Sequence, residues 1–201
     1  MIKMNKIATG LAASVLLVSA GHVAAETVTS TATATVQNAF TLAEVTALDF
    51  GTFRATNTTV ALGGVATLVR PANAATASST SATTGAAKIQ SLVEGAPGEY
   101  TVSGVAGFST LTLTLPLTTE VTLAAAGTPA GVATFAVEDF TAYKTSGTAG
   151  AIALASSVGT FQVDSAGEAT FTIGASLETV PSDDTYADVP YSGDYIVTVE
   201  Y

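Results

Sequence analysis

The chain contains no cysteine and no tryptophan, and its only histidine and both methionines lie within the first 22 residues. Beyond that stretch, a Ser-His-Asp or Cys-His catalytic site has no base or thiol available. Zinc sites built from His and Cys side chains are excluded there for the same reason. Without cysteine no disulfide can form, so the core must hold unaided. We therefore predict a protein that is not an enzyme and has no catalytic residue, cofactor or metal site.

Positive charge is also scarce. The 201 residues include six Lys and Arg against sixteen Asp and Glu. An acidic protein is repelled by nucleic acids and by anionic membrane surfaces, and its charge favours solubility. We expect no nucleic-acid partner.

The first 25 residues predict a cleavable signal peptide. Two lysines form a short basic region, residues 7 to about 20 are apolar, and Val23 and Ala25 occupy the positions that a signal peptidase reads. The apolar run is short for a membrane span, which needs about 20 residues; a retained anchor is the alternative. Cleavage after Ala25 leaves four basic and sixteen acidic residues, a net charge of −12. We expect export to the periplasm, cell surface or medium, with no membrane insertion of the mature chain.

The remaining chain is rich in Thr, Val, Ala and Gly, and its apolar residues recur with a period of two. Leucines alternate with threonines over residues 111–115, and similar short runs begin at Phe135, Phe161 and Phe171. Such alternation is typical of half-buried β-strands, and Gly or Pro turn signals separate the runs about every ten residues. The pattern predicts an all-β protein in which residues 26–201 form one immunoglobulin-like antiparallel β-sandwich.

Three local sequences carry more particular predictions. Residues 71–87 are nearly all Ala, Ser and Thr without periodicity, which predicts a flexible surface loop. Gly174 is expected to end the strand that precedes it. Asp49-Phe50-Gly51 spells the magnesium-binding triplet of protein kinases, but the other kinase elements are missing. We expect Phe50 to be buried there and Gly51 to make a bend.

Paired carboxylates are the remaining source of chemistry, because a glycosidase needs only two acids. Glu138-Asp139 and Asp183-Asp184 are adjacent pairs. Neighbours on a strand point to opposite faces, so solvated surface acids are the simpler interpretation. Residues 182–194 hold four aspartates, and oxygen-rich loops can bind calcium, although the spacing is not that of an EF-hand. Calcium binding in this segment stays open at this point.

Residues 27–36, which begin at the second residue after the predicted leader, alternate strictly. Threonines occupy one face of residues 27–36, and the opposite face is small and apolar, with Val28, Ser30, Ala32, Ala34 and Val36. The segment is either the first strand of its own domain or a donor strand that leaves its chain and completes the open sheet edge of another subunit. Strand addition of that kind gains affinity from main-chain hydrogen bonds and specificity from alternate side chains.

The last seven residues alternate in the same way. One face is apolar and aromatic, and the other is mixed: Tyr195, Val197, Val199 and Tyr201 lie on the first, and Ile196, Thr198 and Glu200 on the second. This pattern predicts a terminal strand with one face toward the core.

Several stretches together have a familiar order and spacing: Leu48-Asp49-Phe50-Gly51-Thr52-Phe53, then residues 98–104, 115–116, 137–140 and 167–177, and finally residues 191–201 with the sequence YSGDYIVTVEY. They resemble a family of exported bacterial domains of unknown function with an LDFG motif and a C-terminal YSGxYxVTVxY strand. Both end motifs are also similar to spore-coat-protein-U-type pilins of archaic chaperone–usher systems. That resemblance implies fimbrial polymerisation by donor-strand exchange, with a periplasmic chaperone and an usher as partners. It implies no catalytic residue.

The sequence thus predicts a non-catalytic extracytoplasmic structural protein, a pilin-like or cell-surface subunit that assembles through β-strand edges. The alternative is a surface adhesion module that recognises carbohydrate or protein through loops at residues 71–87 and 182–194. A carboxylate-based hydrolase is a third hypothesis.

Overall fold

The computed structural model describes residues 30–34, 39–82, 87–117, 121–127 and 130–201. The chain divides into two units, Met1–Thr35 and Val36–Tyr201. In the first unit, the described residues 30–34 belong to no strand and their side chains are exposed. Within the described residues, no helix has the length and apolar character needed to span a membrane.

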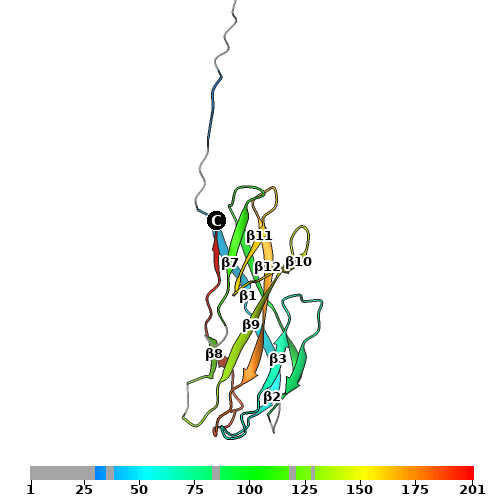
Figure 1. Ribbon diagram of the computed structural model, residues 1–201, viewed down its shortest axis with the longest axis vertical. Helices are drawn as coiled ribbons and strands as arrows, with labels where there is room; N and C mark the ends of the chain where they lie inside the picture. Colours follow the sequence, from blue (N-terminus) through cyan, green and yellow to red (C-terminus); the bar gives the residue numbers. More distant parts are fainter. Residues whose placement is uncertain (1–29, 35–38, 83–86, 118–120, 128–129) are drawn as a thin grey trace, which may run out of the picture. The chain divides into compact units, whose positions relative to one another are not determined.

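The second unit is built from antiparallel strands, and its described residues contain no helix. The larger sheet has the order β1-β6-β12-β9-β8-β13, with β3 beside β12, β4 beside β3 and β10 beside β9 (Figure 1). Its strands are β1 (Thr41–Thr46), β3 (Ala66–Arg70), β4 (Ser79–Ala82), β6 (Gly98–Ser103), β8 (Val121–Ala125), β9 (Phe135–Lys144), β10 (Gly150–Ile152), β12 (Ala169–Thr179) and β13 (Tyr191–Ser192).

Two smaller sheets face this one. One has the order β11-β7-β14 and the other pairs β2 with β5. Their strands are β7 (Thr110–Thr114), β11 (Val158–Gln162), β14 (Thr198–Glu200), β2 (Asp49–Thr56) and β5 (Lys88–Ala96). Every ladder between the strands that the structure describes is antiparallel. The predicted all-β class and antiparallel sandwich are therefore confirmed.

The core lies between the layers. Leu111 and Leu113 of β7 are fully buried while the threonines between and beside them are not, as the alternation predicts. Aromatic rings connect the layers: Phe161 of β11 lies 5.3 Å from Phe171 of β12, measured between ring centroids. Burial of each large apolar side chain contributes about 1.5–3 kcal/mol, so these alternating positions hold the sandwich together without a disulfide.

The prediction that Gly174 ends a strand is wrong. Strand β12 continues through Gly174 to Thr179 and pairs with β9, β6 and β3. A side chain at Gly174 would meet the backbone of Arg70 and Ala72. Glycine at this position therefore permits close approach of the segment that follows β3, and it does not break the strand.

The predicted surface loop at residues 71–87 is also wrong in part, because it contains β4. Ser79–Ala82 pairs with β3, from Ala66 opposite Ala82 to Val69 opposite Ser79. All four side chains of β4 are exposed. A strand with both faces exposed needs no apolar alternation, so its sequence shows no period. Residues 83–86 lie outside the described residues.

The Asp49-Phe50-Gly51 triplet has the structural role predicted for it. Phe50 is buried, and Gly51 has a φ of +82° that favours glycine. The Gly51 N–H donates to Asp49 Oδ1 at 2.8 Å. A side chain at Gly51 would overlap the backbone of Val93 and Gly95 in β5. The motif therefore shapes the start of β2 and seats it against β5.

Candidate functional site

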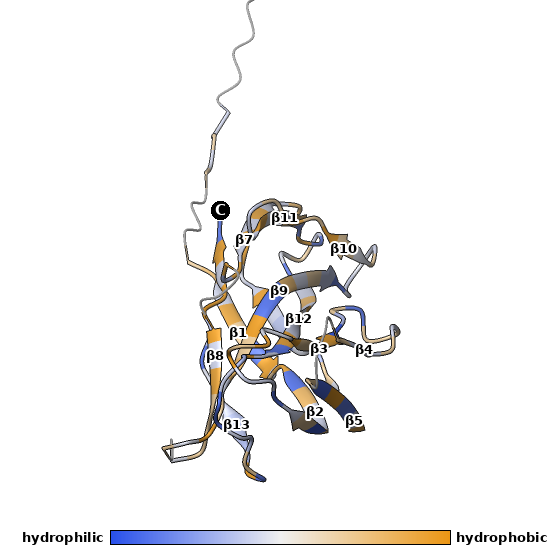
Figure 2. Cartoon of the chain, turned by 60° about the horizontal axis from the view of Figure 1, so that its bottom comes forward, coloured by the Kyte–Doolittle hydropathy of each residue, from blue (hydrophilic) through white to orange (hydrophobic). Residues whose placement is uncertain are grey.

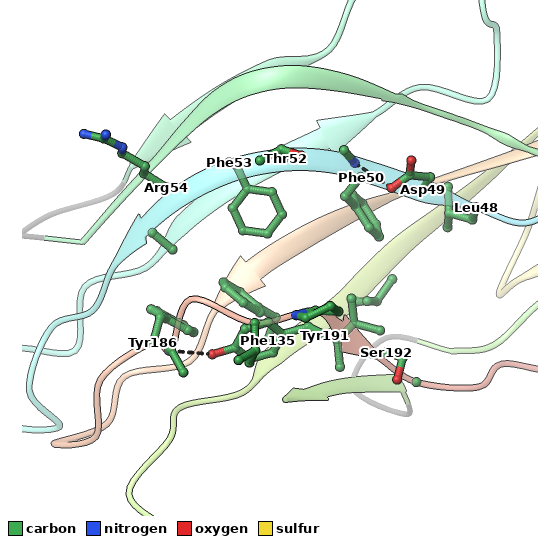
Figure 3. Close-up of a pocket in the computed structure, with 18 of the residues that line it drawn as sticks. Leu48, Asp49, Phe50, Thr52, Phe53, Arg54, Phe135, Tyr186, Tyr191 and Ser192 are labelled. Atoms are coloured by element: carbon green, nitrogen blue, oxygen red, sulfur yellow. Dashed lines mark hydrogen bonds between the residues drawn. The ribbon is translucent and has the colours of Figure 1, made fainter. Parts of the chain in front are cut away.

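An open groove with a volume of about 1090 Å³ lies between β2 and residues 186–195 (Figure 3). Strands β8 and β9 supply Val121, Leu123, Phe135 and Val137 to its lining. Figure 2 shows β2 and β5 on one side of this region and β8 and β13 on the other. We call it the β2 groove. Its apolar and aromatic lining further includes Phe50, Phe53, Ala55, Leu92, Tyr186, Val189, Tyr191 and Tyr195.

The first wall of the groove is β2. This strand pairs with β5 from Asp49 opposite Ala96 to Thr56 opposite Lys88. Among the strands that the structure describes, β5 is its only ladder partner, so its other edge forms no sheet pairing. The rings of Phe50 and Phe53 project from β2 toward the opposite wall (Figure 3). A strand edge of this kind is a template for pairing with another chain.

The opposite wall is organised around Phe135 of β9. Tyr186 stacks on Phe135 with centroids 4.2 Å apart and planes 9° apart, and Tyr191 meets it edge-on at 5.1 Å. From across the groove, Phe53 makes a further edge contact with Phe135 at 5.4 Å. Each such ring pair contributes about 0.5–1.5 kcal/mol beyond its buried area. The cluster fixes a wall that has little regular strand structure.

Hydrogen bonds fix the same two tyrosines. Tyr186 Oη donates to the carbonyl oxygen of Thr134 at 3.3 Å. Tyr191 Oη accepts the backbone N–H of Ala187 at 2.9 Å. Because the phenol groups bond to nearby backbone, the rings present their apolar faces to the cluster and the groove.

A third tyrosine fixes the wall near Leu48. Tyr195 Oη lies 2.7 Å from Tyr100 Oη, and Tyr100 also donates to Glu44 at 3.3 Å. The Tyr195 ring lies 5.3 Å from Phe140 of β9. Burial raises the pKa of Tyr195. Burial also raises the pKa of Tyr100, and the hydrogen bond to Tyr195 and the negative charge of Glu44 raise that pKa further.

The groove offers few groups suited to a reaction. Burial raises the pKa of Tyr186 to about 12, so this phenol is neutral near pH 7. The charged side chains of the lining are Asp49, Arg54 and Asp188, and Asp49 already accepts a hydrogen bond from Gly51. Across the described residues, no group of three or more His, Cys, Asp or Glu side chains is placed to hold a metal ion. The groove provides apolar surface and an open strand edge, the features that bind an extended chain.

The structure places the predicted terminal-strand face partly in the core. Val199 is buried, and Val197 and Tyr195 are half-buried against the hydrophobic core. Tyr201 is 54% exposed, and Ile196 on the opposite face is 77% exposed. Only Thr198–Glu200 forms strand β14, so the regular strand is shorter than the alternation of the sequence.

The structure describes three of the five residues of the predicted donor-strand face. Ser30, Ala32 and Ala34 are described, belong to no strand and are exposed. Val28 and Val36 lie outside the described residues.

Sequence reasoning did not identify the aromatic cluster around Phe135. Its members come from β2, β9 and residues 186–191, far apart in the chain. The one local signal was the presence of three tyrosines within residues 186–195.

Comparisons with protein-family models, with curated proteins and with solved structures return no match to this chain.

Proposed function

We propose that this protein is a non-catalytic, exported structural subunit, pilin-like in kind, which assembles by accepting an extended strand from another copy of itself into the β2 groove. The observation that carries the proposal is the combination of a β2 edge that has no ladder partner among the described strands with an aromatic groove about 1090 Å³ in volume. A strand inserted there would hydrogen-bond to the main chain of β2 and cover the rings beneath it.

Residues 28–36 have the properties that such a strand needs. Nine residues in extended form span about 30 Å at roughly 3.3 Å per residue, which suits the eight residues of β2. Their alternate positions are Val, Ser and Ala. Phe50, Phe53 and Phe135 line the groove, and a strand with small side chains would lie against these rings.

The described part of this segment, residues 30–34, is open to pairing with another chain. Residues 30–34 are exposed and belong to no strand. Their alternation of threonine with small apolar residues would place one face toward the groove and a hydroxyl face toward solvent. Threonine has high β-propensity, so the segment is suited to the extended conformation when a partner sheet is present.

Export and a periplasmic chaperone are part of the proposal. Large exposed apolar surfaces and unpaired strand edges promote aggregation unless something covers them. Before assembly, the apolar groove and the β2 edge of each subunit would have to be covered by another protein. A chaperone that lends a strand, together with an usher in the outer membrane, would supply one.

The first test removes the donor segment. Material sheared from cells that produce the full chain is compared with material from a variant lacking residues 26–36, by electron microscopy and sedimentation. We expect polymers from the parent chain and monomers from the deletion variant. Polymers of unchanged length from the deletion variant would contradict strand exchange.

A matched pair of substitutions tests the groove itself. Leu92 lines the groove and is 53% exposed, whereas its neighbour Val93 is 60% exposed and is not part of the lining. Because both side chains are exposed, Leu92→Asp and Val93→Asp should affect folding similarly. We expect Leu92→Asp to reduce assembly and Val93→Asp to leave it unchanged; equal effects would show that the groove is not the site of assembly.

A further inference from the structure

A buried arginine at the end of β3 is paired with an exposed glutamate of β5. The Arg70 side chain is 5% exposed, and its Nη1 donates to Glu94 Oε1 at 2.9 Å. Within the part of the chain that the structure describes, Arg70 Nε and Nη2 are buried and have no hydrogen-bond partner. A buried charge is tolerated where a group of opposite charge compensates it. The carboxylate of Glu94 is therefore the group that compensates the charge of Arg70.

The same carboxylate oxygen also holds the segment that leads into β4. The backbone N–H and the hydroxyl of Ser78 both donate to Glu94 Oε1 at 3.0 Å. Glu94 and Ser78 also line a cavity of about 330 Å³ between β4 and β5. Because a cavity contributes no van der Waals contact, the polar contacts of Glu94 join β5 to this side of the larger sheet. We call Arg70, Ser78 and Glu94 the Glu94 clasp.

The Glu94 clasp bears on the strand that walls the groove. Glu94 lies opposite Gly51 in the ladder between β5 and β2. The β2–β5 pair is also anchored by apolar contacts, because Phe50 and Ile89 are buried in the core. Loss of the clasp would therefore loosen the β2–β5 pair without removing it from the core.

Arg70 is the charged group that faces Glu94. The segment that leads into β4, and β4 itself, contain no ionisable side chain. The other charged residues of β2 and β5 are Asp49, Arg54 and Lys88, and none of these three forms an ion pair or a hydrogen bond with Glu94. The state of the clasp thus depends on the ionisation of one carboxyl group.

That carboxyl group can be protonated without unfolding of the domain, because the Glu94 side chain is 54% exposed. The hydrogen bonds from Ser78, and then the Arg70 guanidinium, hold the pKa of Glu94 below its usual value. Stabilisation by such a group is present above the unfolded pKa of about 4.3 and is lost as the pH falls through the lower, folded-state pKa. A protonated Glu94 no longer compensates the buried charge of Arg70.

We propose that the Glu94 clasp is an acid-sensitive lock: protonation of Glu94 loosens β2 and β5 against β3, while β9 and β12 stay paired. An uncompensated buried guanidinium is strongly destabilising, so a loosened seam that lets water reach Arg70 becomes the favoured state. As a means of regulating the β2 groove, the lock rests on the proposed function. The loosening itself does not depend on what the groove binds.

Amide hydrogen exchange of the full chain, read by mass spectrometry as protection factors at pH 7 and pH 3, tests the lock. We expect acid to lower the protection of β2 and β5 by at least about tenfold relative to β9 and β12, because losing one charge of a buried pair is strongly destabilising. Glu94→Gln should lower the protection of β2 and β5 already at pH 7. The matched control Glu200→Gln, which changes an exposed acid of β14, should not.

A double variant tests the reason for the loosening. Arg70→Met combined with Glu94→Gln removes the buried charge together with its partner, so β2 and β5 should regain protection close to that of the parent at pH 7. Unchanged protection in Glu94→Gln, equal acid loosening of β9 and β12, or a double variant as loose as Glu94→Gln would overturn the lock. A parent chain that forms no polymers would instead contradict the proposed function and leave the lock standing.

Discussion

Substitution of Gly51 tests the packing of β2, the strand that forms one wall of the groove. Its φ of +82° costs an L-residue roughly 1–2 kcal/mol. A Cβ at this position would also overlap the backbone of Val93 and lie 2.5 Å from the Gly95 nitrogen, so β2 or β5 must shift. Overpacking of this kind typically costs a further 1–3 kcal/mol or so. We expect Gly51→Ala to lower the free energy of unfolding by about 2–5 kcal/mol, a large share of the total for a domain.

Two other glycines provide matched controls. Gly63 has a φ of +61° with nothing within 4 Å of a Cβ, so Gly63→Ala should cost only the backbone strain of roughly 1–2 kcal/mol. Gly150 has neither a positive φ nor a neighbour within 4 Å, so Gly150→Ala should be neutral or stabilise slightly. Urea unfolding followed by circular dichroism and tyrosine fluorescence measures all three. If Gly51→Ala costs no more than Gly63→Ala, the close approach of β2 to β5 is not the constraint described here.

Two further predictions concern ionisable groups. Tyr100→Phe removes the hydrogen bonds to Tyr195 and Glu44 and should cost about 1–3 kcal/mol at pH 7. Because the pKa of Tyr100 is raised in the folded state, the stabilisation by its protonated phenol is fully present below the unfolded pKa of about 10 and is lost as the pH rises above that value. The Phe variant should therefore lose stability less steeply than the parent at alkaline pH. Parallel curves of urea midpoint against pH would refute this. Burial and the charges of Glu178 and Asp139 raise the pKa of Glu138, so its carboxylate destabilises the fold above its unfolded pKa. Glu138→Gln should therefore raise the urea midpoint at pH 7, with a gain that shrinks as the parent becomes protonated in acid; a gain independent of pH would contradict it.

The parts of the fold that were predictable from the sequence are those set by local alternation. Leu111 and Leu113 point to the core because successive side chains of a strand face opposite sides. Gly174 was misread because the reason for a glycine there is the backbone of Arg70, which lies 104 positions earlier in the chain. Strand β4 was missed because a strand exposed on both faces leaves no period in its sequence.

The groove was less predictable still. Periodicity indicates which face of a strand is buried, but it does not indicate which strands become neighbours. Among the described strands, β2 forms a ladder with β5 alone. The ring cluster joins Phe53, Phe135 and Tyr186 across the fold. The alternation of residues 27–36, in contrast, was visible in the sequence and predicted a strand that pairs either within its own domain or with another subunit.

The central claim is that the β2 groove accepts the N-terminal segment of another copy. Amide hydrogen exchange in the variant lacking residues 26–36 tests it directly, with a synthetic peptide of residues 27–36 added. We expect slower exchange along β2 and a higher melting temperature, and a peptide with Asp in place of Ala32 and Ala34 should produce neither. Unchanged exchange at β2 with the parent peptide, or equal protection by both peptides, would contradict the account.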